Sequence, residues 1–218
     1  MQEIIENNNE NLNFTDKDIF RKIWTSPRKV FKYINEKHYD KYVTMLLILS
    51  GISNAFDRAS MKNMGDTMSL ESIIGLSIVI GGLLGWISFY FYAALLSWTG
   101  KWLNGKSNTT AIIRIISYAM IPSIIALVFL IPQIAIYGVE IFKEDGDIIS
   151  AGLISNIFVY VSAFLESILG IWTLILCIIG ISEVQKFSIG KAILNIILPV
   201  IVILIPIVII VLLFQSFS

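Results

Sequence analysis

Residues 188–217 read SIGKAILNIILPVIVILIPIVIIVLLFQSF, a run in which Lys191 carries the only charge. The hydrocarbon core of a bilayer is about 30 Å thick, and a helix rises about 1.5 Å per residue, so roughly 20 such residues cross it. The run therefore predicts a transmembrane helix and marks the chain as an integral membrane protein.

Further apolar segments lie upstream of this run. Three of them pass the same test of length: Ser72–Trp98, Ala111–Phe142 and Ile148–Ser182. A fifth segment, Tyr42–Phe56, is shorter and ends at Asp57, so it either spans a locally thinned bilayer or lies in the interface. The sequence predicts an all-α, polytopic membrane protein.

Composition supports this class and argues against others. The chain is 56% hydrophobic and 15% charged, which is too apolar for a typical soluble domain. Its net charge of zero favours no nucleic-acid partner. Its single cysteine, Cys177, and single histidine, His38, predict neither a metal site nor a cofactor. We find no HExxH motif, phosphate-binding glycine loop, Gly-x-Ser-x-Gly elbow or paired carboxylates, so we do not expect an enzyme.

The distribution of basic residues predicts the topology. With five spans and a cytoplasmic N-terminus, thirteen of the sixteen Lys and Arg residues fall inside and three outside. If Tyr42–Phe56 did not span, the split would be eleven to five. We therefore predict a bundle of five transmembrane helices over residues 42–218, with the C-terminus outside, and a cytoplasmic arm over residues 1–41.

The arm has two parts. Residues 1–13 are rich in Asn and Glu and are predicted to be disordered. Two short amphipathic helices are expected after them, the second beginning at Ser26-Pro27. Their polar side predicts binding to anionic membrane through Arg21, Lys22, Trp24, Arg28, Lys29 and Lys32. Two alternatives are that the apolar face packs on the inner ends of the membrane helices and, less favoured, that it binds a partner protein.

Small residues recur every fourth position in the segment Ser72–Trp98. Ser77, Gly81 and Gly85 form a small-xxx-small pattern, which allows two helix backbones to approach closely. The pattern predicts helix packing, either within the chain, which we favour, or between two copies.

Glu166 is the most informative single residue, because it lies near the middle of a predicted span. A carboxyl group at that depth must be protonated, paired or hydrated, so it marks a candidate polar site. Its expected partners on other helices are Tyr118, Gln133 and Asn195. Glu166 is either a protonated acid that hydrogen-bonds a neighbouring helix, which we favour, or part of a transport route.

Several short motifs resemble those of the Yip domain family, the Ypt/Rab-interacting membrane proteins. Residues 179–188 read IGISEVQKFS, and Lys191-Ala192 follows. Other matching stretches are Ile171-Trp172-Thr173, Gly100, Gly105, Tyr118 to Ser123 with Pro122, and Trp24 to Arg28.

This resemblance implies five transmembrane helices, a cytoplasmic N-terminus and association with other membrane proteins. Eukaryotic members act with small GTPases in vesicle traffic. Here Ile48 to Ile52 replace their Asp-Leu-x-Gly-Pro signature, so a GTPase partner is not expected. The chain resembles the prokaryotic branch, which places it in the inner membrane if it is bacterial.

These observations favour a non-enzymatic membrane protein that organises or binds lipids and partner proteins, including copies of itself. The alternative is a small transporter or permease subunit that uses the Glu166 face. A water-filled cavity reaching Glu166 would favour transport, whereas a closed bundle would favour the organising role.

Overall fold

The computed structural model describes residues 13–148, 150 and 152–216. Most of the predicted disordered segment, residues 1–13, therefore lies outside the described residues. The described elements are helices, in agreement with the predicted all-α class. In chain order they are α1 (Asp16–Lys22), α2 (Pro27–Glu36), α3 (Val43–Met61), η1 (Met64–Asp66), α4 (Leu70–Trp102), α5 (Thr109–Ala119), α6 (Ile121–Tyr137), η2 (Gly138–Phe142), α7 (Leu153–Gln185) and α8 (Ile189–Ser216).

Four stretches of helix are long and apolar enough to cross a membrane: Leu70–Trp102, Thr109–Phe142, Leu153–Gln185 and Ile189–Gln215. They match the four longer predicted segments. The ends of each predicted segment lie within a few residues of the ends of the observed helix. The shorter predicted segment corresponds to α3, which is not among these four. Whether α3 spans stays a prediction.

Local sequence explains where the helices begin and end. Thr15 and Asp18 form a capping box at the start of α1, and Asn108 caps α5 by accepting a hydrogen bond from the Ala111 amide. The helical path is interrupted at Met120, and Pro122 occupies the first turn of α6, where its missing amide costs no helical bond.

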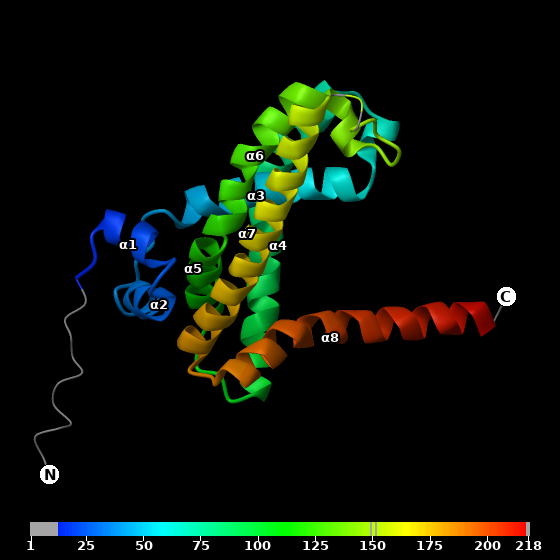
Figure 1. Cartoon of the computed structure of the whole chain (residues 1–218). Coiled ribbons are helices and arrows are strands. Elements are labelled where there is room, and N and C mark those ends of the chain that lie inside the picture. Colours follow the sequence, from blue (N-terminus) through cyan, green and yellow to red (C-terminus); the bar gives the residue numbers. More distant parts are fainter. Residues whose placement is uncertain (1–12, 149, 151, 217–218) are drawn as a thin grey trace, which may run out of the picture.

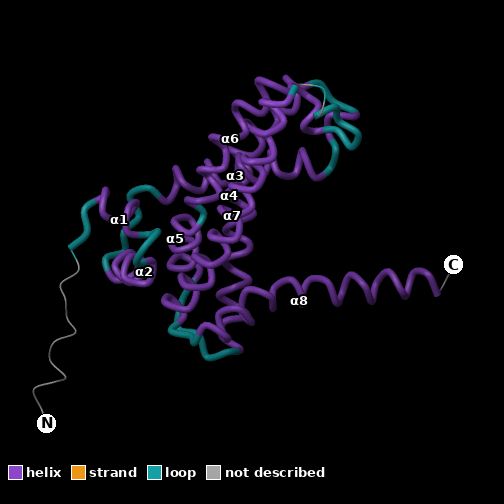
Figure 2. The backbone as a smooth tube through the Cα atoms, in the orientation of Figure 1, coloured by secondary structure: helices purple, strands orange, loops and turns teal. Residues whose placement is uncertain are grey.

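The long helices α4 and α7 run the length of the bundle, which therefore has two ends (Figures 1 and 2). At one end, called the η end, η1 lies beside η2. At the other, called the arm end, the α4–α5 turn meets the end of α7, where the Lys106 amide donates to the Gln185 carbonyl at 3.3 Å. Helix α3 starts beside the arm and finishes at the η end, where Ser60 donates to the carbonyl of Ile141.

Helix α5 forms the centre of the larger core. Residues 112–119 of this helix are all buried, by α3, α4, α7 and the arm. Helix α8 differs, because only its first part packs on α4 and α7. The rest of the helix projects away from the other helices (Figure 1). Most of the described apolar side chains beyond Pro199 are exposed.

Candidate functional site

The carboxyl group of Glu166 faces α6, where it meets Gln133. The side-chain nitrogen of Gln133 donates to Glu166 Oε1 at 2.8 Å and to Ser162 Oγ at 2.8 Å. Ser162 lies one helical turn before Glu166 on α7 and donates to the carbonyl of Val159. The three side chains thus form a polar contact between two apolar helices, with Gln133 in the partner role that its sequence position suggested.

A cavity of about 200 Å³ lies beside this contact, between α3, α6 and α7. Its polar lining comes from Glu166 of α7 and from Ser123 and Gln133 of α6 on one side, and from Ser53, Asp57 and Ser60 of α3 on the other. The wall also includes Gly170, one turn deeper than Glu166, and Phe142 of η2. The cavity therefore extends from the η end to the level of Glu166.

Asp57 is the functional candidate that the sequence analysis missed. We expected the span to end at Phe56, which left Asp57 in a loop, and we found no paired carboxylates. The structure instead places Asp57 inside α3 and on the same cavity as Glu166. The signal was present in the helical spacing of Ser53, Asp57 and Ser60, which puts them on one face.

The structure does not bring the other two expected partners to Glu166. Tyr118 is fully buried near the arm, with its ring centroid 6.1 Å from that of Tyr39 and 6.3 Å from that of Phe20. Asn195 is buried at the arm end, where its side-chain nitrogen donates to Thr99 Oγ1 at 2.9 Å. The four residues are therefore divided among three clusters, which lie at different positions along the bundle.

Asn195 belongs to a buried amide cluster centred on Gln185. The Gln185 side chain accepts from the Ser107 amide at 3.0 Å and donates to the Leu96 carbonyl at 3.2 Å. Asn195 donates to the same carbonyl at 3.2 Å. The cluster joins the end of α4, the end of α7 and the start of α8, and its central residue, Gln185, belongs to the motif over residues 179–188.

The small residues of α4 pack against α3. A β-carbon at Gly85 would lie 2.5 Å from the Cα of Gly51, and one at Gly81 would lie 2.8 Å from the Gly51 carbonyl oxygen. Ser77 is also buried, one turn before Gly81. This face of α4 is therefore occupied within the chain, where it permits close contact of two backbones.

The arm is folded against the bundle by its apolar side. Five of its apolar side chains have no exposed surface: Ile19, Ile23, Val30, Phe31 and Ile34. Helix α2 packs on α5 and α7. The apolar face of the arm thus packs on the membrane helices. This is the arrangement that the sequence analysis gave as an alternative to membrane binding by the arm.

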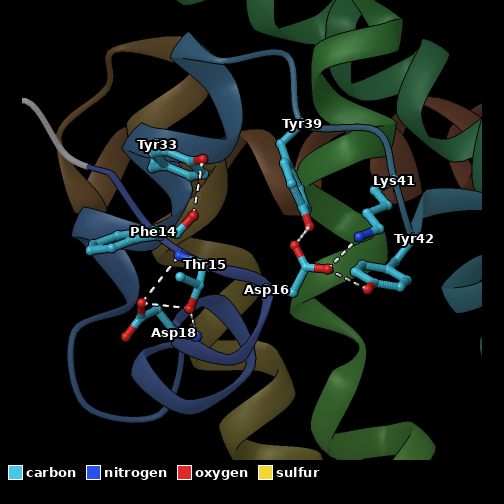
Figure 3. Close-up of polar contacts among 8 residues, drawn as sticks. All are labelled: Phe14, Thr15, Asp16, Asp18, Tyr33, Tyr39, Lys41 and Tyr42. Atoms are coloured by element: carbon cyan, nitrogen blue, oxygen red, sulfur yellow. Dashed lines mark hydrogen bonds and ion pairs between the residues drawn. The ribbon is translucent and has the colours of Figure 1, made fainter.

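Asp16 links the arm to the start of α3 (Figure 3). Tyr39 and Tyr42 each donate to its carboxylate at 2.6 Å, and Lys41 pairs with it. The hydrogen bond from Lys41 and those from the two tyrosines hold the pKa of Asp16 well below its usual range. Hydrogen bonds from Thr15 lower the pKa of Asp18 to about 2.

A buried guanidinium provides a second link. Arg114 of α5 is 4% exposed, and its Nε donates to Asp40 Oδ1 at 2.6 Å and its second terminal nitrogen to Oδ2 at 3.1 Å. This two-pronged contact fixes the segment between α2 and α3. It accounts for the only basic residue found in the predicted segment Ala111–Phe142.

The basic residues of the arm lie around this docked structure. Arg21, Arg28 and Lys29 are exposed, whereas Lys32 and Trp24 are half-buried. Lys22 pairs with Asp18 at 3.2 Å, and Lys32 approaches Glu36 at 4.0 Å, both within their own helices. The exposed cations therefore form a polar surface opposite the buried apolar face.

The cavity and the arm both offer groups that can bind a ligand. Among the described residues, no three His, Cys, Asp or Glu side chains are grouped as a metal site would require. The cavity offers carboxylate, amide and hydroxyl groups, whereas the arm offers exposed cations.

Comparison with known proteins identifies the family. The Yip1 domain model matches residues 21–210, which includes about half of the arm and all of the bundle up to the last turns of α8. No curated protein and no solved structure matches the chain. The match and the four long apolar helices show a multi-pass integral membrane protein of a non-enzymatic family. The chain belongs to the Yip1 domain family.

Proposed function

We propose that this protein organises anionic lipids and partner proteins at the cytoplasmic face of the membrane. The observation that carries the proposal is the docked arm. Its apolar face is buried against α5 and α7, while Arg21 and Arg28 are exposed on the opposite side. A basic surface held next to membrane helices attracts anionic headgroups or acidic protein segments, each Lys or Arg contributing about 1 kcal/mol near the membrane surface.

The topology that we propose has five spans, with the arm (residues 1–41) in the cytoplasm and the transmembrane domain over residues 42–218. Helix α3 has 19 residues, which at about 1.5 Å per residue is close to the thickness of the hydrocarbon core. It starts beside the arm, where Tyr42 donates to Asp16, and finishes at the η end, and the thirteen-to-three division of basic residues favours this direction. The C-terminus is then outside, and a bacterial host would place the protein in its inner membrane.

Membrane lipids and other membrane proteins are the proposed partners. Helices α4, α7 and α8 expose many apolar side chains, which lipid tails or further helices would cover. Self-association fits the same surfaces. We propose no small-GTPase partner, because α3, the first of the five proposed spans, lacks the Asp-Leu-x-Gly-Pro signature of the eukaryotic members.

The topology can be tested by cysteine labelling in intact cells, after Cys177 is replaced by serine. Lys62→Cys at the η end should react with an impermeant maleimide from outside. Lys106→Cys in the α4–α5 turn should react only after the membrane is permeabilised. Labelling of Lys106→Cys in intact cells would contradict the proposed orientation.

Lipid binding can be tested with the full-length protein in nanodiscs that contain phosphatidylglycerol and phosphatidylcholine. Native mass spectrometry should show retained phosphatidylglycerol that is lost in the variant Arg21→Glu/Arg28→Glu and that falls as salt rises. Arg58→Glu/Lys62→Glu, the same charge change at exposed positions of the η end, is the control. Equal retention in all three proteins would contradict the lipid-binding role.

A second candidate is a small transporter or permease subunit, and the cavity that reaches Glu166 favours it. Glu166→Gln would then fold normally but lose substrate movement in reconstituted vesicles. If substrate movement by this variant equals that of wild type, a transport role for the carboxyl group is excluded.

A further inference from the structure

The cavity between α3, α6 and α7 contains two acidic side chains without a basic counterpart in its wall. Asp57 accepts no hydrogen bond and forms no ion pair among the described residues, and Glu166 is engaged only by Gln133. Neither Lys nor Arg lines the cavity. A negative charge in such a place is stabilised by a bound cation, because uncompensated charge within a membrane protein is costly.

Gln133 gives an independent indication of a ligand. Its side chain is 9% exposed, and its nitrogen donates to both Ser162 and Glu166. Its side-chain oxygen accepts no hydrogen bond within the described part of the chain. Gln133 lines the cavity, and an accessible amide oxygen that no described protein group engages is suited to a ligand that donates N–H or O–H.

Two aromatic rings distinguish an organic cation from a metal ion. Phe56 and Phe142 line the cavity, and their rings stack with centroids 6.3 Å apart and planes at 27°. Ring faces attract ammonium groups, and apolar walls favour their carbon substituents. Divalent metal ions instead prefer a closely spaced set of oxygen, nitrogen or sulfur ligands.

The size and opening of the cavity also fit an organic cation. Its volume of about 200 Å³ exceeds that needed for a bare ion, because one liquid water occupies only about 30 Å³. Asp57 and Ser60 are exposed at the η end. A ligand can therefore enter beside α3 without separating the helices.

We propose that this cavity binds a small organic ammonium cation. The ammonium group lies between the carboxylates of Asp57 and Glu166 and donates to the oxygen of Gln133. Its alkyl part contacts Phe56 and Phe142. This inference goes beyond the proposed lipid-organising function and does not depend on it, because it concerns equilibrium binding at the opposite end of the bundle.

The test uses the full-length protein in detergent at pH 7, with propylammonium chloride as the probe and isothermal titration calorimetry as the readout. Wild type should bind the probe saturably in constant sodium chloride, and the neutral analogue 1-propanol should give no saturable heat. Asp57→Asn and Glu166→Gln should each weaken binding at least about tenfold. Glu144→Gln, which removes an exposed carboxylate at the same end but outside the cavity, should leave binding unchanged.

Absence of saturable binding to wild type would overturn the proposal. Equal losses in the Glu144→Gln control would do the same, since they would indicate general charge attraction. Full competition by equimolar sodium would assign the site to inorganic cations and overturn the organic class. If Glu166→Gln does not fold, Asp57→Asn still decides the outcome, because Asp57 is exposed and without a partner among the described residues. Loss of lipid retention in the arm variant, with propylammonium binding intact, would reject only the lipid-organising role.

Discussion

The side-chain amide of Gln185 fills the space beside Gly100 that the β-carbon of any other residue would occupy. A β-carbon at Gly100 would overlap Nε2 of Gln185 and lie 3.0 Å from Cδ. The Gln185 side chain cannot move aside without loss, because it is hydrogen-bonded to Leu96 and Ser107. Gly100 and Gln185, both in stretches that resemble the family, thus pack directly against each other.

Gly100→Ala should lower the free energy of unfolding by about 1–3 kcal/mol, the usual cost of overpacking a tightly fitted interior. Gly75→Ala in the same helix is the matched control, because a β-carbon there meets no atom within 4 Å. Its effect should not exceed about 1 kcal/mol. Thermal unfolding in detergent measures both, and equal midpoints would contradict the proposed contact.

The contact also predicts non-additivity. Gln185→Ala alone should destabilise the bundle, because it leaves the Ser107 amide and the Leu96 carbonyl with fewer partners. In the double variant the alanine at position 100 gains the space that the glutamine vacated. The double variant should therefore be more stable than the sum of the two single effects, and strict additivity would show that the two residues act independently.

The sequence indicated Gln133 as one of three possible partners of Glu166, because all three are polar residues in apolar spans, and the structure pairs Glu166 with Gln133. The sequence does not determine which parts of two helices lie side by side, so Tyr118, near the arm, and Asn195, at the arm end, could not be separated from this pair. The arm illustrates another limit. An apolar face such as that of Ile23 and Phe31 suits a lipid surface and a helix bundle equally well, and only the tertiary contacts distinguish them. Asp57 could not be recognised because its charge predicts the end of the span, whereas α3 continues to Met61.

The crossing of α3 and α4 should depend on Gly51. A β-carbon there would overlap the Gly81 carbonyl oxygen and lie 3.0 Å from the Cα of Gly85. Gly51→Ala should lower the unfolding midpoint, whereas Gly190→Ala, whose β-carbon would meet open space, should not. Light scattering should show the same oligomeric state in both. Loss of an oligomer with unchanged stability would instead indicate that this face joins two copies.

Docking of the arm should weaken at low pH. The pKa of Asp16 is depressed by its hydrogen bonds, so its contribution is complete above the ordinary carboxyl pKa of about 4 and is lost as the pH falls through the depressed value. A fluorophore on Thr25→Cys, in a Cys177→Ser background, should gain rotational freedom over this range. Asp16→Asn should reduce the pH dependence and, with Asp18→Asn added, remove most of it.

The matched control for this measurement carries the fluorophore on Lys62→Cys, at the η end. Its anisotropy should not follow the same pH profile, since η1 and η2 make no contact with Asp16. A common profile at both positions would indicate global unfolding and would contradict local release of the arm.

The hydrogen bond between Gln133 and Glu166 should stabilise the contact of α6 with α7. Glu166→Gln preserves an acceptor for the Gln133 amide and should leave the free energy of unfolding close to that of wild type. Glu166→Ala should lower it by about 0.6–2 kcal/mol, the range found for hydrogen bonds between membrane helices. Ser167→Ala, at the next, exposed position, should change it little, because Ser167 bonds only within its own helix. In a Gln133→Leu background the cost of Glu166→Ala should fall, because the partner is already absent. Reversible unfolding in mixed detergent micelles measures wild type and the five variants. If Glu166→Ala is as stable as wild type, the carboxyl group contributes nothing to helix packing, and its place on the cavity wall must be explained by the ligand that it binds.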